Sequence, residues 1–188
     1  MDRATQLASV CALLADGEVG AAKASLDAHY PRASVSTPRR SWTLKRLMAV
    51  FLRDGFTDRY SGVRLVFPGT LRALSILMPN EFPYHPNWKH SATHPAFWEM
   101  YPTIDHVVPV ARGGADDESN AVTTSMLRNA AKANWLLEEL GWPAELEPIA
   151  RDWDGLLAWF MSSWDRHESL RQDMSLRRWH RAASAALA

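Results

Sequence analysis

The chain has 188 residues, of which 47% are hydrophobic and 22% charged, a balance that excludes an intrinsically disordered protein and predicts a buried core. No apolar run approaches the roughly 18 residues that span a bilayer, and the N-terminus lacks a convincing signal-peptide cleavage site, so we expect a cytoplasmic protein. Cys11 is the only cysteine, which excludes an intramolecular disulfide and a zinc site built on cysteines.

The formal net charge is zero, but basic residues concentrate in one segment. Residues 31–72 contain nine basic and two acidic residues, a net charge of +7. Such a segment could form a surface that binds phosphate groups. Charge alone supports equally well the alternative, in which these are solvated arginine side chains on helix faces. The basic residues are Arg32, Arg39, Arg40, Lys45, Arg46, Arg53, Arg59, Arg64 and Arg72.

The N-terminal part of the chain is predicted to be helical. Residues 3–15 and 18–29 read as two short helices separated at Gly17, and the Pro-, Ser- and Arg-rich stretch 31–40 reads as a linker. A further helix is expected from Ser41 to a stop at Asp54-Gly55.

Shorter elements follow. The run VRLVF (63–67) predicts a short strand. Thr70 is expected to cap a helix that ends near Pro79-Asn80. Four prolines and many aromatic residues predict an ordered loop over 80–102.

Residues 103–140 predict the order strand, loop, strand, helix. TIDHVVPV (103–110) alternates like a strand, and Gly113-Gly114 supply the backbone freedom of a turn. Residues 121–123 can return as a second strand, after which Thr124 or Ser125 caps a helix to about Leu140.

The tail, 147–187, predicts two helices. Trp153, Leu157, Phe160 and Trp164 recur at helical spacing and predict one apolar face. The simplest organisation is one α+β domain over 1–188, with a helical arm and linker (1–40), a core (41–142) and a helical tail (143–188).

Asp105-His106 is the strongest candidate for chemistry. A carboxylate beside an imidazole at a strand end can supply a metal ligand and a general base. Asn129 and Lys132 share one face of the predicted helix, and they converge with this pair if the hairpin packs there. The alternative is a hydrogen-bonded core histidine and ordinary helix-surface residues.

The set DHVVP (105–109), Gly113-Gly114, Asn120 and Asn129-x-x-Lys132 resembles the signature of the HNH, or ββα-metal, nucleases. The order and spacing are similar to the HNH domain of RNA-guided DNA-cutting enzymes, in which Asn holds the third signature position. The resemblance implies a short β-hairpin packed on a helix, with the active site within 103–135.

The resemblance also implies roles for these residues. His106 is then the general base, and Asp105 and Asn129 hold Mg²⁺ or another divalent ion such as Mn²⁺. Asn120 braces the loop and helps to orient His106, and Lys132 contacts a phosphate. Beyond the motif, Arg112 in the loop and the basic segment with Arg53 and Arg59 are expected to contact nucleic acid, although Arg112 could equally be a free loop arginine.

Many HNH proteins also bind a structural zinc through two Cys-x-x-Cys pairs. Arg53-Asp54-Gly55-Phe56 resembles the stretch before the first pair, which would fall on Asp58 and Ser61. The second pair comes just before the third signature residue and would fall on Ser125 and Arg128. No structural zinc is therefore expected, and packing of tryptophans is expected to replace it. His85, His90 and His94 could form another metal site, but aromatic packing and capping explain them as well.

The predicted function is a metal-dependent HNH endonuclease that hydrolyses DNA phosphodiesters with His106 as base. The alternatives are a non-catalytic nucleic-acid-binding module with an HNH-like fold, and an RNA-cutting or nonspecific toxin nuclease. Cutting both strands would favour a homodimer, which the helical tail could form; the sequence does not decide the oligomeric state.

Overall fold

The computed structural model describes residues 2–29, 42–143, 146–147, 149 and 151–188. The chain divides into two compact units, Met1–Pro38 and Arg39–Ala188. The described part of the first unit is a pair of helices, α1 (Arg3–Ala15) and α2 (Val19–His29), as predicted. The predicted linker 31–40 lies outside the described residues.

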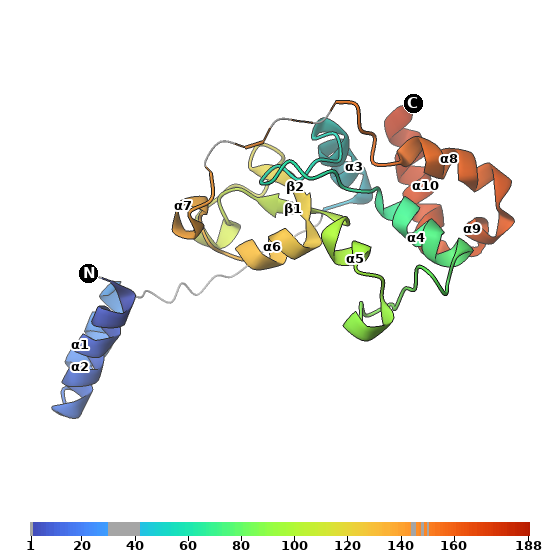
Figure 1. Cartoon of the computed structure of the whole chain (residues 1–188). Coiled ribbons are helices and arrows are strands. Elements are labelled where there is room, and N and C mark those ends of the chain that lie inside the picture. Colours follow the sequence, from blue (N-terminus) through green and yellow to red (C-terminus); the bar gives the residue numbers. More distant parts are fainter. Residues whose placement is uncertain (1, 30–41, 144–145, 148, 150) are drawn as a thin grey trace. The chain divides into compact units, whose positions relative to one another are not determined.

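The second unit combines helices with a small antiparallel sheet, so the α+β class is confirmed (Figure 1). The sheet consists of β1 (Pro102–His106) and β2 (Ala121–Ser125), with Asp105 opposite Val122 and His106 opposite Ala121. The other elements of the second unit are α3 (Leu44–Arg53), α4 (Pro68–Leu77), the 3-10 turn η1 (His90–Ala92), α5 (Ala96–Glu99), the 3-10 turn η2 (Val110–Arg112), α6 (Met126–Lys132), α7 (Leu137–Leu140), α8 (Leu157–Arg166), α9 (Glu168–Gln172) and α10 (Met174–Leu187).

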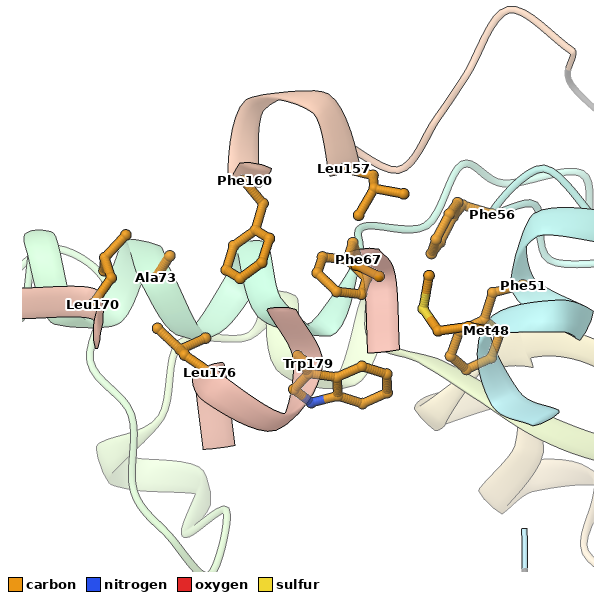
Figure 2. Packing of buried hydrophobic residues seen from close by; sticks show 11 residues of the cluster. Met48, Phe51, Phe56, Phe67, Ala73, Leu157, Phe160, Leu170, Leu176 and Trp179 are labelled. Carbon is orange, nitrogen blue, oxygen red and sulfur yellow. The ribbon is translucent and has the colours of Figure 1, made fainter. Parts of the chain in front are cut away.

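Aromatic rings form the main hydrophobic core, which α3, α4, α8, α9 and α10 enclose. Phe67 contacts the rings of Phe56, Phe160 and Trp179, with centroids 6.1, 5.1 and 5.5 Å away (Figure 2). A Cβ at Gly69 would lie 2.4 Å from the Phe67 ring, so this position of α4 requires glycine. The core fixes α3 beside the sheet and α10 against α3.

The predicted apolar face of the tail contributes to this core. Leu157 and Phe160 are buried, and Trp153 and Trp164 pack against the cluster at its edge. The tail contains three helices rather than the predicted two, because the chain leaves helical geometry at His167 and again at Asp173.

The predicted strand at 63–67 is wrong. Only Arg64 makes a strand-like bridge, to Thr57. The next three backbone N–H groups donate to Phe56, Met100 and Gly155, which belong to different segments, so no continuous ladder forms. This segment therefore ties several parts of the core together.

Two predicted helix boundaries also differ. Thr70 is not a cap: α4 begins at Pro68, and the Thr70 hydroxyl donates to the carbonyl of Leu156 at 3.0 Å. The helix predicted to run to Leu140 ends at Lys132, because Ala133 has a φ of 46°, and α7 starts separately. Within the described residues, no helix is both long and apolar enough to cross a membrane.

Candidate active site

The β1–β2 hairpin and α6 position the predicted residues. Ser125 ends β2 and caps α6, accepting a hydrogen bond from the backbone N of Arg128 at 3.2 Å. Helix α6 therefore starts directly from the sheet and packs on both strands. This local arrangement brings Asn129 and Lys132 against the end of β1, where Asp105 and His106 lie.

Asp105 is buried and held by two donors. The Tyr60 hydroxyl donates to Asp105 Oδ2 at 2.6 Å, and Lys132 Nζ lies 2.8 Å from the same oxygen. Burial, reinforced by the Asp105 carboxylate, raises the pKa of the Tyr60 phenol, so Tyr60 stays a neutral donor. Sequence reasoning missed Tyr60, because nothing in its local pattern connects it with β1.

Lys132 is buried, whereas the predicted phosphate contact requires an exposed side chain. Its side chain is 0% exposed, and Nζ also donates to the backbone carbonyl of His106 at 2.8 Å. Because the ammonium is enclosed between Asp105 and His106, it fixes these two residues and does not present its charge at the surface.

His106 is oriented by a carboxylate that the sequence analysis did not select. Its Nε2 lies 2.9 Å from Asp116 Oδ1, and the Trp42 indole N–H donates to the same oxygen at 3.1 Å. With Nε2–H donating to Asp116, Nδ1 carries the free lone pair. The sequence feature that could have pointed to Asp116 is the acidic run Asp116-Asp117-Glu118, which lies in the loop between β1 and β2.

Asn120 braces the loop between the strands. Its Oδ1 accepts from the backbone N of Val108 at 3.0 Å, and its Nδ2 donates to the carbonyls of Val108 and Ala115, both at 2.8 Å. The backbone N of Val107 also donates to the Asn120 carbonyl at 2.8 Å. These bonds close the loop immediately after His106, the place at which the resemblance puts a bracing role.

The two loop glycines are needed for different reasons. A Cβ at Gly114 would lie 1.9 Å from the Val108 carbonyl oxygen and 2.7 Å from Asn120 Nδ2. Gly113 has open space around it but a φ of +93°.

We expect Gly114→Ala to break the Asn120 brace and to speed amide hydrogen exchange of Val107 and Val108 several-fold, since a typical intramolecular hydrogen bond contributes about 0.5–1.5 kcal/mol. Gly113→Asn is the matched control, because asparagine tolerates the left-handed conformation. Equal exchange in both variants would contradict the proposed brace.

Asn129 faces the strand with its amide nitrogen. Nδ2 donates to Thr103 Oγ1 at 3.0 Å and to the carbonyl of Ile104 at 3.1 Å. Because a carbonyl can only accept, these contacts leave Oδ1 as the end of the amide that could ligate a metal. Asp105, His106 and Asn129 together line one pocket of about 160 Å³.

This donor set fits a weakly held divalent cation. Carboxylate and amide oxygens are the ligands that Mg²⁺ prefers, together with retained water. In the part of the chain that the structure describes, no group of three His, Cys, Asp or Glu side chains could hold a metal. A cation here would therefore rely on Asp105 and Asn129 and keep most of its hydration, and the Lys132 charge would weaken its binding.

The four positions that correspond to zinc-binding cysteines lie together. Ser61 N donates to the Asp58 carbonyl at 3.2 Å, and Asp58 Oδ2 accepts from Ser125 N at 3.0 Å. The same oxygen lies 3.6 Å from Arg128 Nε. The Arg128 guanidinium also lies over the Trp142 ring, 5.1 Å from its centroid. An ionic and hydrogen-bonded contact joins these segments, and of the tryptophans Trp142 lies beside it.

We expect Asp58→Ala to lower the free energy of unfolding by about 3–5 kcal/mol, because it leaves buried donors unsatisfied. Asp58 is 1% exposed, whereas Asp152, which pairs with Arg64, has a side chain 72% exposed. Asp152→Ala is therefore the control and should change stability by less than about 1 kcal/mol in urea unfolding. Similar losses in both variants would rule out this role for Asp58.

The predicted basic surface over 31–72 is not a run of unopposed charge. In the described part, five of its arginines pair with acids, and three of these acids lie outside the segment: Arg46 with Glu118, Arg53 and Arg59 with Asp54, Arg64 with Asp152, and Arg72 with Asp173. Arg53 also donates to the carbonyls of Glu118 and Ala121, at 2.8 and 2.6 Å. Arg32, Arg39 and Arg40 lie outside the described residues.

Arg112 pairs with Glu139 at 3.1 Å, with a side chain that is 41% exposed. Nucleic-acid contacts by Arg53, Arg59 and Arg112 stay predictions.

The three clustered histidines serve packing and capping. His94 stacks on Phe82 at 4.1 Å, and its Nδ1 accepts from the backbone N of Ala96. His85 Nδ1 accepts from the backbone N of Asn87, and His90 packs on Trp98 with centroids 5.1 Å apart. They form no candidate metal group among the described residues.

Comparisons of the chain with protein-family models, with curated proteins and with solved structures find no match.

Proposed function

We propose that this chain is a metal-dependent endonuclease of the HNH type that hydrolyses DNA phosphodiester bonds. The observation that carries the proposal is the meeting of Asp105, His106 and Asn129 at one pocket, with one ring nitrogen of His106 held by the Asp116 carboxylate. This combination offers a general base beside two hard oxygen ligands.

Each residue has a role in this proposal. Asp105 and Asn129 would hold a divalent cation, which when bound stabilises negative charge on a phosphate. His106 Nδ1 takes a proton from the attacking water, and Asp116 stabilises the imidazolium that forms. Lys132 and Asn120 keep the Asp105-His106 pair in place from either side.

Two further features support the resemblance to HNH nucleases. The signature residues lie on β1, on the loop before β2 and on α6, in the expected order. The four positions of the absent zinc site come together although the cysteines are missing, with Asp58 contacting Ser125 and lying near Arg128.

Metal titration tests the proposal independently of cleavage. Purified full-length protein is titrated with Mn²⁺ by electron paramagnetic resonance, beside Asp105→Asn, Asn129→Ala and the control Asn87→Ala at an exposed position. We expect one site, weakened tenfold or more by the first two changes and unaffected by the third. Identical binding by all four proteins would remove Asp105 and Asn129 as ligands. DNA binding without metal binding or cleavage would indicate a binding module.

A comparison of substrates distinguishes the proposed DNA nuclease from an RNA-cutting nuclease. Duplex DNA, single-stranded DNA and RNA of the same sequence are incubated with the protein and Mg²⁺ or Mn²⁺. Cleavage of DNA supports the proposal, and cleavage confined to RNA would assign the chain to the RNA-cutting nucleases.

Asp116 provides a test of how His106 is held. Asp116→Ala should lower the cleavage rate by about 10²–10⁴-fold, because a carboxylate that orients a catalytic imidazole sets how well the base works. Asp116→Asn should retain more activity, because its amide oxygen can still accept from Nε2–H. Turnover should fall in both variants while KM stays unchanged, and a fall confined to KM would contradict the positioning role.

A further inference from the structure

A second pocket shares two lining residues, His106 and Ile104, with the polar pocket, the one lined by Asp105, His106 and Asn129. It has a volume of about 260 Å³ and lies among α3, β1 and α10. Its lining includes the rings of Trp42, Tyr101 and Trp179. The proposed cleavage chemistry uses none of these three rings.

The aromatic walls are fixed in position. Trp42 donates to Asp116, lies edge-on to His106 with centroids 5.9 Å apart, and carries the Arg46 guanidinium 4.1 Å from its ring centroid. On the inner side, Phe51 and Trp179 belong to the hydrophobic core. A pocket with such walls is preformed, and a planar ligand can enter it without ordering the side chains first.

The helix that supplies Trp179 also carries positive charge. Arg177, Arg178 and Arg181 are exposed on α10, a helix without acidic residues. These arginines make α10 positively charged, and the Arg46 guanidinium lies over the Trp42 ring of the pocket. Proteins bind single-stranded nucleic acid with positive charge for the backbone and aromatic rings for the bases.

We propose that this pocket binds a nucleobase of the substrate, next to the phosphate at the polar pocket, by stacking on its aromatic walls. This inference rests on the proposed function for its placement beside the scissile bond. It identifies the substrate class as nucleic acid with an unstacked base, either a single strand or a locally melted duplex. Stacking accepts every base, so little sequence preference is expected from this contact.

Binding of a fluorescent base tests the pocket without any cleavage. The probe is a single-stranded DNA octamer with a central 2-aminopurine, whose fluorescence falls when the base stacks, and the buffer contains EDTA. Leu47 lines the pocket, and Leu47→Trp should fill it. The matched control is Leu187→Trp, at a leucine 58% exposed near the end of α10. Wild type and control should quench the probe, whereas Leu47→Trp should bind about tenfold more weakly and lose the quenching.

Equal affinity and quenching in wild type and Leu47→Trp would overturn the proposal. If Leu47→Trp does not fold, as judged by its circular dichroism and melting, Trp42→Leu replaces it, since Trp42 is only half-buried. Trp42→Leu should also lose the quenching, and unchanged quenching would again overturn the proposal. A fully paired duplex that binds as tightly as the single strand would contradict the substrate class.

The failures of the two proposals are distinguishable. If wild type cuts DNA but Leu47→Trp leaves base quenching unchanged, the nuclease proposal stands and the base pocket is wrong. If quenching depends on Leu47 while no metal supports cleavage, the pocket binds bases and the nuclease proposal is wrong.

Discussion

Replacing His106 with alanine is expected to lower the rate of metal-dependent DNA cleavage by about 10²–10⁴-fold, the usual contribution of a general base. His106 lines the polar pocket and is the imidazole that Asp116 orients. Alanine removes the proton acceptor while the backbone carbonyl that Lys132 contacts is kept. The measurement is the rate of plasmid nicking at saturating Mg²⁺.

The control for this experiment is His167→Ala, at an exposed histidine between α8 and α9. It should cut at the wild-type rate. His106→Ala should also bind Mn²⁺ with nearly wild-type affinity, because Asp105 and Asn129 remain. An active His106→Ala variant would show that another group accepts the proton.

Replacing Lys132 with methionine is expected to lower the free energy of unfolding by about 3–5 kcal/mol, the cost of breaking a buried ion pair from one side. The change leaves Asp105 enclosed without its counter-charge, although Tyr60 still donates to it. It also removes the donor to the His106 carbonyl. Equilibrium unfolding in urea measures the loss.

Two further variants make this result specific. Lys45→Met, at an exposed lysine of α3, should change stability by less than about 0.5 kcal/mol. Adding Asp105→Asn to Lys132→Met should restore part of the loss, because the double variant has no unpaired buried charge. Additive losses in the double variant would contradict the coupling of these two residues.

The elements around the candidate site were predictable because their determinants are local. Ser125 caps α6 from the adjacent residue, and Gly113-Gly114 and Asn120 close the loop between neighbouring strands. Periodicity and turn chemistry read such short-range effects directly. The same holds for the helices of the first unit and for the apolar face of α8.

Features that depend on distant partners were not predictable from the sequence. The run 63–67 has strand-like composition, but its hydrogen-bond partners come from several segments, so it forms only one bridge. A count of charges indicated that residues 31–72 could form a basic surface. In the structure, Glu118, Asp152 and Asp173 from other segments pair with arginines of this segment. Local patterns do not say which charges meet in the folded chain.

Lys132 and Asp116 illustrate the same limit within the site. A lysine one turn after Asn129 reads as an exposed phosphate ligand, yet it fills the space between Asp105 and the His106 carbonyl. Asp116 belongs to an acidic loop that reads as solvated, yet it holds His106. The role of Lys132 follows from how α6 packs on β1, and the role of Asp116 follows from how its loop folds back on His106.

The proposed activity is cleavage of DNA with a divalent ion at the Asp105–His106–Asn129 pocket. Supercoiled plasmid incubated with the full-length protein tests it most directly, with Mg²⁺ or Mn²⁺, with EDTA, and with metal restored after EDTA. We predict nicked or linear product with either ion, none with EDTA, and recovery when the metal returns. Intact plasmid under all metal conditions, from protein that is folded and binds DNA, would contradict the claim.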